Sequence, residues 1–157
     1  MWPTEWPAPA RAIASGVDSA VTAAHAADPA GFTDATADLA DLPADQLTTV
    51  LSAIIRELLE TAHPDGLTGD DVRAVLAAVV RRSAAWLPTV DPGAIITALT
   101  GALGIDEAED PDRAPSNPRP AAILLIEYLA DLTDTPPDQC VRRAIAEIAR
   151  GETIEMP

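Results

Sequence analysis

Lysine is absent from this chain of 157 residues, so arginine supplies all ten of its Lys and Arg positions. Without an ε-amine, the chain cannot form a Schiff base, and it lacks the lysine with which a P-loop binds phosphate. Several classes of lysine-dependent enzyme are therefore excluded. The lack of lysine, together with the abundance of alanine, is typical of GC-rich codon usage and suggests a GC-rich bacterium or one of its phages as the source.

Cysteine and long apolar runs are also scarce. Cys140 is the only cysteine, so no disulfide can form within the chain and a reducing compartment is expected. The apolar run 74–80 is far shorter than the roughly 18 residues of a membrane span. The first nine residues, MWPTEWPAP, lack the basic region and apolar core of a signal peptide. We therefore expect a cytoplasmic protein that does not bind membranes.

Negative charge dominates the surface chemistry. The chain has 25 acidic residues against ten arginines, which gives a net charge of −15. This charge repels nucleic-acid phosphates, so we expect no direct binding to DNA or RNA. The negative charge favours a basic protein partner, which could be a DNA-binding protein whose DNA site this chain occupies. Solubility alone is the other explanation of the acidity.

The most apolar stretch, 121–132 (AAILLIEYLADL), predicts the centre of the fold. On a helical wheel its apolar residues cover most of the surface, so other helices must enclose it. Apolar residues at helical spacing also mark 44–62 and 72–87, with a break at 63–66 that predicts an antiparallel hairpin. We predict an all-α protein, a single helical bundle of five to seven helices around a buried helix near 118–132.

Capping residues predict where several helices begin. Asp28-Pro29 and Asp91-Pro92 each place an N-cap residue before a proline at the first helical position. Thr68 and Asp71 have the spacing of a capping box. Asn117-Pro118 and the segment 135–138 are further helix starts of this kind.

Two segments differ from the bundle pattern. Residues 1–9 form a Pro/Trp arm, and residues 10–157 form one helical domain that includes an acidic, proline-rich loop at 105–120. Prolines favour an extended arm. Its Trp2 and Trp6 must pack either on their own bundle or on a partner. The candidate partner-binding residues in these two segments are Trp2, Trp6, Asp106, Glu107, Glu109, Asp110 and Asp112.

Only one pair of residues suggests acid–base chemistry. Glu127 and Asp131 lie one turn apart on the most apolar helix, where like charges would raise one pKa. A solvent-facing polar line is the simpler interpretation of that pair. Glu60 and His63 have the spacing of the Glu-x-x-His motif of di-iron bundles, but the second such motif that a di-iron site needs is missing. His63 suits a helix C-terminus instead. We assign no catalytic, metal or cofactor residue, and we expect Cys140 to be a packed core residue.

By elimination, the sequence favours a non-catalytic helical module for protein–protein interaction: an adaptor, an assembly protein or an inhibitor. One alternative is a small helical-bundle enzyme or ligand-binding protein that uses Glu127 and Asp131. Another is an acidic DNA mimic that antagonises a DNA-binding protein. We expect a protein partner or self-association, without a cofactor.

Overall fold

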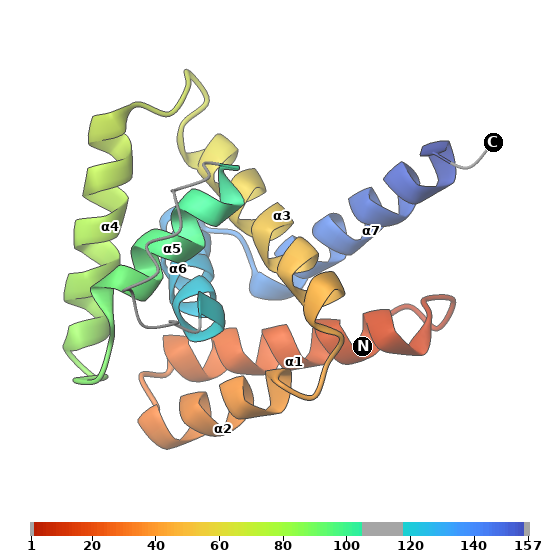
Figure 1. Ribbon diagram of the computed structural model, residues 1–157, viewed down its shortest axis with the longest axis horizontal. Helices are drawn as coiled ribbons and strands as arrows, with labels where there is room; N and C mark the ends of the chain where they lie inside the picture. Colours follow the sequence, from red (N-terminus) through yellow and green to blue (C-terminus); the bar gives the residue numbers. More distant parts are fainter. Residues whose placement is uncertain (1, 105–117, 156–157) are drawn as a thin grey trace, which may run out of the picture.

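The computed structural model describes residues 2–104 and 118–155, and within these residues the chain is entirely helical (Figure 1). The all-α bundle predicted from the sequence is therefore confirmed. The helices are α1 (Ala8–His25), α2 (Pro29–Leu39), α3 (Ala44–Ala62), α4 (Gly69–Ala84), α5 (Pro92–Ala102), α6 (Pro118–Leu132) and α7 (Pro137–Glu155). None of the described helices combines the length and the apolar character that crossing a membrane requires.

Helix α6 is the centre of the bundle, as its apolar sequence predicts. It contacts each of the other six helices. Its large side chains Ile123, Leu125 and Leu129 are completely enclosed. Burial of this apolar surface on all sides supplies the main driving force for packing the shorter amphipathic helices around it.

The predicted helix starts are confirmed wherever the structure describes them. The Asp28 carboxylate accepts a hydrogen bond from the Gly31 backbone N–H, and Asp91 does the same for Gly93. Thr68 and Asp71 form the complete capping box that begins α4. Each of these caps satisfies backbone donors that the first helical turn leaves without a partner. Asn117 lies outside the described residues.

The predicted hairpin between the third and fourth helices is wrong. Helix α4 packs mainly on α5 and α6, whereas α3 packs on α6, α7 and α5. The buried residues Val75 and Val79 give α4 a narrow apolar face. Because α5 and α6 both offer apolar surfaces, α3 and α4 each pack against them, and the short connection at 63–68 does not bring α3 and α4 together.

The N-terminal arm is shorter and more compact than predicted. Helix α1 already begins at Ala8, since Pro9 lies in its first turn, where the missing N–H is not needed. The preceding residues form a turn in which the Trp6 N–H donates to the Pro3 carbonyl at 3.2 Å. The extended shape predicted for residues 1–9 is therefore wrong, because the turn and the early helix start replace it.

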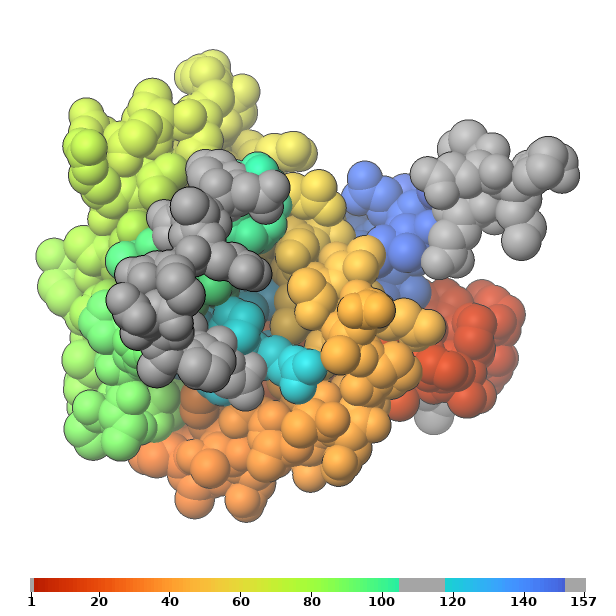
Figure 2. Space-filling view, viewed as in Figure 1, coloured from red at the N-terminus to blue at the C-terminus, as the bar shows by residue number. Residues whose placement is uncertain are grey.

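Helix α7 and the N-terminal part of α1 stand out from one side of the main body (Figure 2). Among the residues of α7 up to Gly151, whose burial is described, the buried ones are Cys140, Val141, Ala144 and Ile145 in the first half of the helix. Beyond them the helix leaves the bundle. This departure opens the surface between α1, α3 and α7.

Candidate functional site

An apolar groove lies between the N-terminal ends of α1 and α3 and the outer half of α7. Its volume is about 370 Å³. The lining residues are Trp6, Pro7, Pro9, Ala10, Ile13, Asp45, Gln46, Thr49, Val50, Ile145, Ile148 and Ala149. Among these, Asp45 is the one charged residue, so the groove is an apolar surface with an acid at its edge.

The amphipathic pattern of α7 explains why the groove remains open. Its apolar stripe continues from Val141 through Ile145 to Ile148, but only the first turns of the helix are covered by α1 and α3. Ile148 is therefore half-buried, although it lies on the same face as the core residues. An apolar stripe that extends past its own core suits a surface that a partner can cover.

The N-terminal turn forms one wall of this groove. The Trp2 and Trp6 rings stack with centroids 6.1 Å apart and planes 16° from parallel. The Trp2 Nε1–H donates to Ser15 Oγ on α1 at 3.1 Å, and the Arg142 guanidinium of α7 lies over the Trp2 ring at 5.2 Å. Of the two alternatives given by the sequence, packing of the arm on its own bundle is confirmed.

Five of the candidate partner-binding residues cannot be placed. Asp106, Glu107, Glu109, Asp110 and Asp112 lie in the segment 105–117, which is outside the described residues. The groove and the tryptophans are therefore the part of the predicted binding surface that the structure describes.

Glu127 is the centre of a second candidate site. Its side chain accepts two hydrogen bonds from Arg82 of α4, from Nε to Oε2 at 2.8 Å and from Nη2 to Oε1 at 2.6 Å. Oε1 also accepts from His25 Nδ1 of α1 at 3.1 Å. With 5% of its surface exposed, Glu127 is a buried carboxylate. The solvent-facing interpretation is wrong for Glu127, because Arg82 compensates its charge inside the bundle.

Asp131, one turn further along α6, is exposed and does meet the solvent. Its Oδ2 lies 3.3 Å from Arg82 Nη2, so one guanidinium bridges both carboxylates. The hydrogen bonds to Glu127 are the largest cause of the raised pKa of Arg82. The charged arginine therefore holds the two carboxyl groups of α6 together.

A cleft opens beside this network. Its volume is about 320 Å³, and its polar lining comes from His25, Glu127, Asp131, Asp134, Thr22 and Thr135. The His25 side chain is 65% exposed, while Glu127 contacts its Nδ1. The Glu127 carboxylate thus holds the exposed His25 ring at the edge of the cleft.

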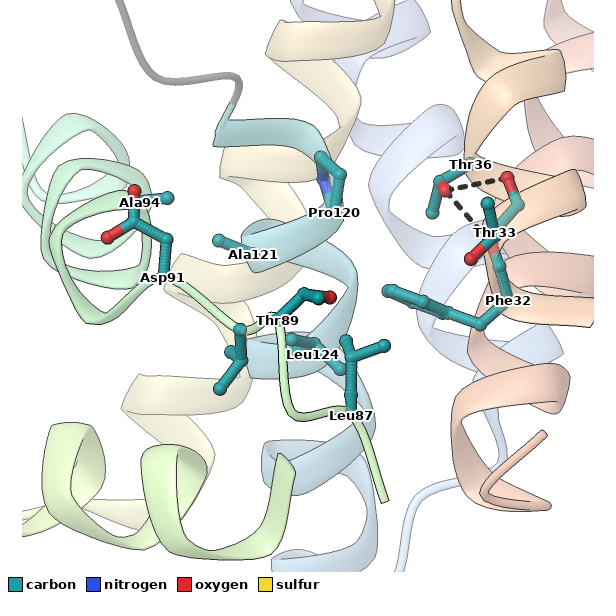
Figure 3. A pocket seen from close by; sticks show the side chains of 11 residues that line it. Phe32, Thr33, Thr36, Leu87, Thr89, Asp91, Ala94, Pro120, Ala121 and Leu124 are labelled. Atoms are coloured by element: carbon teal, nitrogen blue, oxygen red, sulfur yellow. Dashed lines mark hydrogen bonds between the residues drawn. The ribbon is translucent and has the colours of Figure 1, made fainter. Parts of the chain in front are cut away.

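A third hollow, of about 340 Å³, lies between α2, the connection from α4 to α5, and the start of α6 (Figure 3). Two of its polar side chains, Thr36 and Asp91, already have partners within the protein. The Thr36 hydroxyl donates to the backbone carbonyls of Phe32 and Thr33, and Asp91 caps α5. This hollow therefore offers little chemistry to a ligand.

The remaining sequence candidates have structural roles. His63 ends α3, and its Nδ1 donates to the Leu59 carbonyl at 3.1 Å, as expected for a helix C-terminus. Cys140 is 2% exposed, which confirms a packed cysteine, and this burial raises the pKa of its thiol to about 11. Among the described residues, no group of three or more His, Cys, Asp or Glu side chains is arranged to hold a metal ion.

The long-range ion pairs gave no signal in the sequence. Arg82 and Glu127 are 45 residues apart, and His25 and Glu127 are 102 residues apart. Arg143 of α7 likewise lies near an acid on another helix, with its Nη1 3.5 Å from Glu57 Oε1 on α3. No family model, curated protein or solved structure matches this chain.

Proposed function

We propose that this protein is a non-catalytic interaction module that binds an amphipathic helix of a basic protein partner. The groove between α1, α3 and α7 is the single observation that carries the proposal. It offers the partly exposed residues Trp6, Ala10 and Ile148 as apolar contacts from three elements. A helix placed there would insert apolar residues at i, i+3, i+4 and i+7, as in other complexes in which a helix binds in a groove.

Charge supports a basic partner over a second copy of the chain. The charged residue in the groove lining is Asp45, and the whole chain carries a net charge of −15. Two copies would bring like charges together, whereas a basic helix would be attracted during encounter and stabilised at the rim. The groove therefore suits a helix with an apolar stripe flanked by lysine or arginine.

Binding of a labelled synthetic helix tests this function. The probe has leucines at i, i+3, i+4 and i+7 with lysines elsewhere, and a matched peptide carries glutamates in place of the lysines. Fluorescence anisotropy should show binding of the basic peptide that is at least about tenfold tighter than that of the acidic one. Absence of binding by the basic peptide would contradict the proposal.

Two matched substitutions locate the contact. Ile148→Glu places a charge in the groove and should weaken peptide binding about tenfold or more. Leu132→Glu makes the same type of change at an apolar residue that is 54% exposed on α6, outside the groove lining, and should leave binding unchanged. Equal binding by both variants would place the interaction elsewhere. If Ile148→Glu instead converts a dimer into a monomer, the occupant is a second copy.

The cleft at Glu127 supports a second candidate function, the binding of a small cationic ligand. The observation in its favour is the combination of carboxylates from Glu127, Asp131 and Asp134 with the exposed ring of His25. Spermidine should then raise the melting temperature more than sodium chloride of equal ionic strength. Asp131→Asn should remove this difference, whereas Asp70→Asn at an exposed ion pair should retain it. Equal effects of the two salts on the wild-type protein would exclude this function for spermidine-like cations.

A further inference from the structure

The wall that Trp6 contributes to the groove is built from a segment with little regular structure. Trp6 lies before α1, and the turn that contains it has one backbone hydrogen bond, from the Trp6 N–H to Pro3. A single exposed turn of this kind does not by itself hold a large side chain in one position. The position of Trp6 must therefore depend on side-chain contacts.

Those contacts lead to Trp2. Its ring stacks on that of Trp6 at a centroid distance within the usual range for aromatic pairs. Trp2 in turn contacts α1 and α7, two of the three helices that flank the groove. Its indole N–H donates to Ser15 on α1, and the Arg142 guanidinium of α7 lies over its ring.

We infer that Trp2 is a positioning residue for partner binding: anchored by Ser15 and Arg142, it holds Trp6 in place as a wall of the groove. This inference rests on the proposed function. A wall that is ordered before the partner arrives loses less conformational entropy on binding, so anchoring Trp6 increases affinity without adding a contact. The N-terminal tryptophans are thus part of the binding surface and not a free docking arm.

The test uses the full chain and the basic leucine–lysine peptide, with affinities measured at a temperature where every variant is folded. Trp2→Ala should weaken binding about tenfold, and Ser15→Ala, which removes the anchoring hydrogen bond, about threefold. Trp2→Phe retains the stacking and should recover part of the affinity lost in Trp2→Ala. Trp6→Ala, which removes the wall itself, should weaken binding at least as much as Trp2→Ala.

Three controls separate positioning from general loss of stability. Ser19→Ala makes the same change as Ser15→Ala one turn further along α1, at an exposed position. Trp86→Phe repeats the tryptophan change at a residue that packs on Phe32, outside the groove lining. Thr68→Ala removes the cap of α4 and lowers stability at a distance. All three should bind the peptide as the wild type does.

The outcomes distinguish the proposed peptide-binding function from the positioning role of Trp2. If Trp6→Ala weakens binding while Trp2→Ala and Ser15→Ala do not, the groove function stands and the positioning role is wrong. If Trp2→Ala binds more tightly, the arm obstructs the groove and the inference is also wrong. If the wild-type protein fails to bind the peptide, the proposed function itself fails.

Discussion

At the scale of single residues, Glu127 joins three helices that are distant in the sequence. Arg82 of α4 and His25 of α1 both donate to its buried carboxylate on α6. A buried charge of this kind is costly once its partner is removed, even where the pair itself contributes little net stability. The network therefore specifies how α1, α4 and α6 are arranged.

Replacing Glu127 should destabilise the protein more than replacing an exposed acid. Glu127→Ala leaves Arg82 without its buried partner and removes three hydrogen bonds, so we expect a loss of about 3 kcal/mol in the free energy of unfolding. Asp70→Ala breaks the exposed pair with Arg73 and should change stability little. Urea unfolding followed by circular dichroism measures both. Equal effects would mean that the Glu127 network is not buried in solution.

Cys140 should be unreactive in the folded protein. Burial disfavours the thiolate and raises the thiol pKa to about 11, so at pH 8 almost no reactive form is present. Labelling with a thiol-specific disulfide reagent should be slow in native buffer and fast in denaturant. Rapid labelling at pH 8 without denaturant would show that the start of α7 opens readily.

At the scale of elements, α1 and α2 pack closely against each other at Gly16. A Cβ atom added at Gly16 of α1 would lie 2.9 Å from Leu39 Cδ2 and 3.3 Å from Leu42 Cδ1. Leu39 is fully buried, so it has little room to move. The absence of a side chain at Gly16 therefore allows α2 to approach α1.

Two glycine substitutions should have opposite effects. Gly101→Ala on α5 meets no atom within 4 Å and should stabilise the protein by about 0.5–1 kcal/mol through its higher helix propensity. Gly16→Ala gains the same propensity but displaces Leu39, so a net loss of about 1 kcal/mol is expected. Thermal unfolding of the two variants gives the comparison. Stabilisation by Gly16→Ala would show that the contact between α1 and α2 is looser than described.

At the scale of the whole molecule, the net charge of −15 opposes the compact state. Repulsion among exposed acids is screened when the Debye length falls, from about 30 Å in 10 mM salt to below about 8 Å above 150 mM. The melting temperature should therefore rise as sodium chloride is added over this range. A melting temperature that falls with salt would mean that the exposed acids are mostly engaged in favourable ion pairs.

The sequence by itself determined the features that depend on neighbouring residues. Helical spacing of apolar residues identified the bundle and its central helix, and the caps at Asp28, Thr68 and Asp91 marked where helices begin. These signals are readable because a cap or a helical face involves residues within a few positions of one another.

Only the tertiary structure decided which distant residues meet. The burial of Glu127 with Arg82 and His25 depends on the packing of three helices around α6, and no local spacing encodes it. The short connection after α3 wrongly suggested a hairpin, because the choice of packing partner is set by the apolar surface available in the whole bundle. The groove likewise exists because α7 extends beyond the helices that cover its first half, and that geometry depends on the fold.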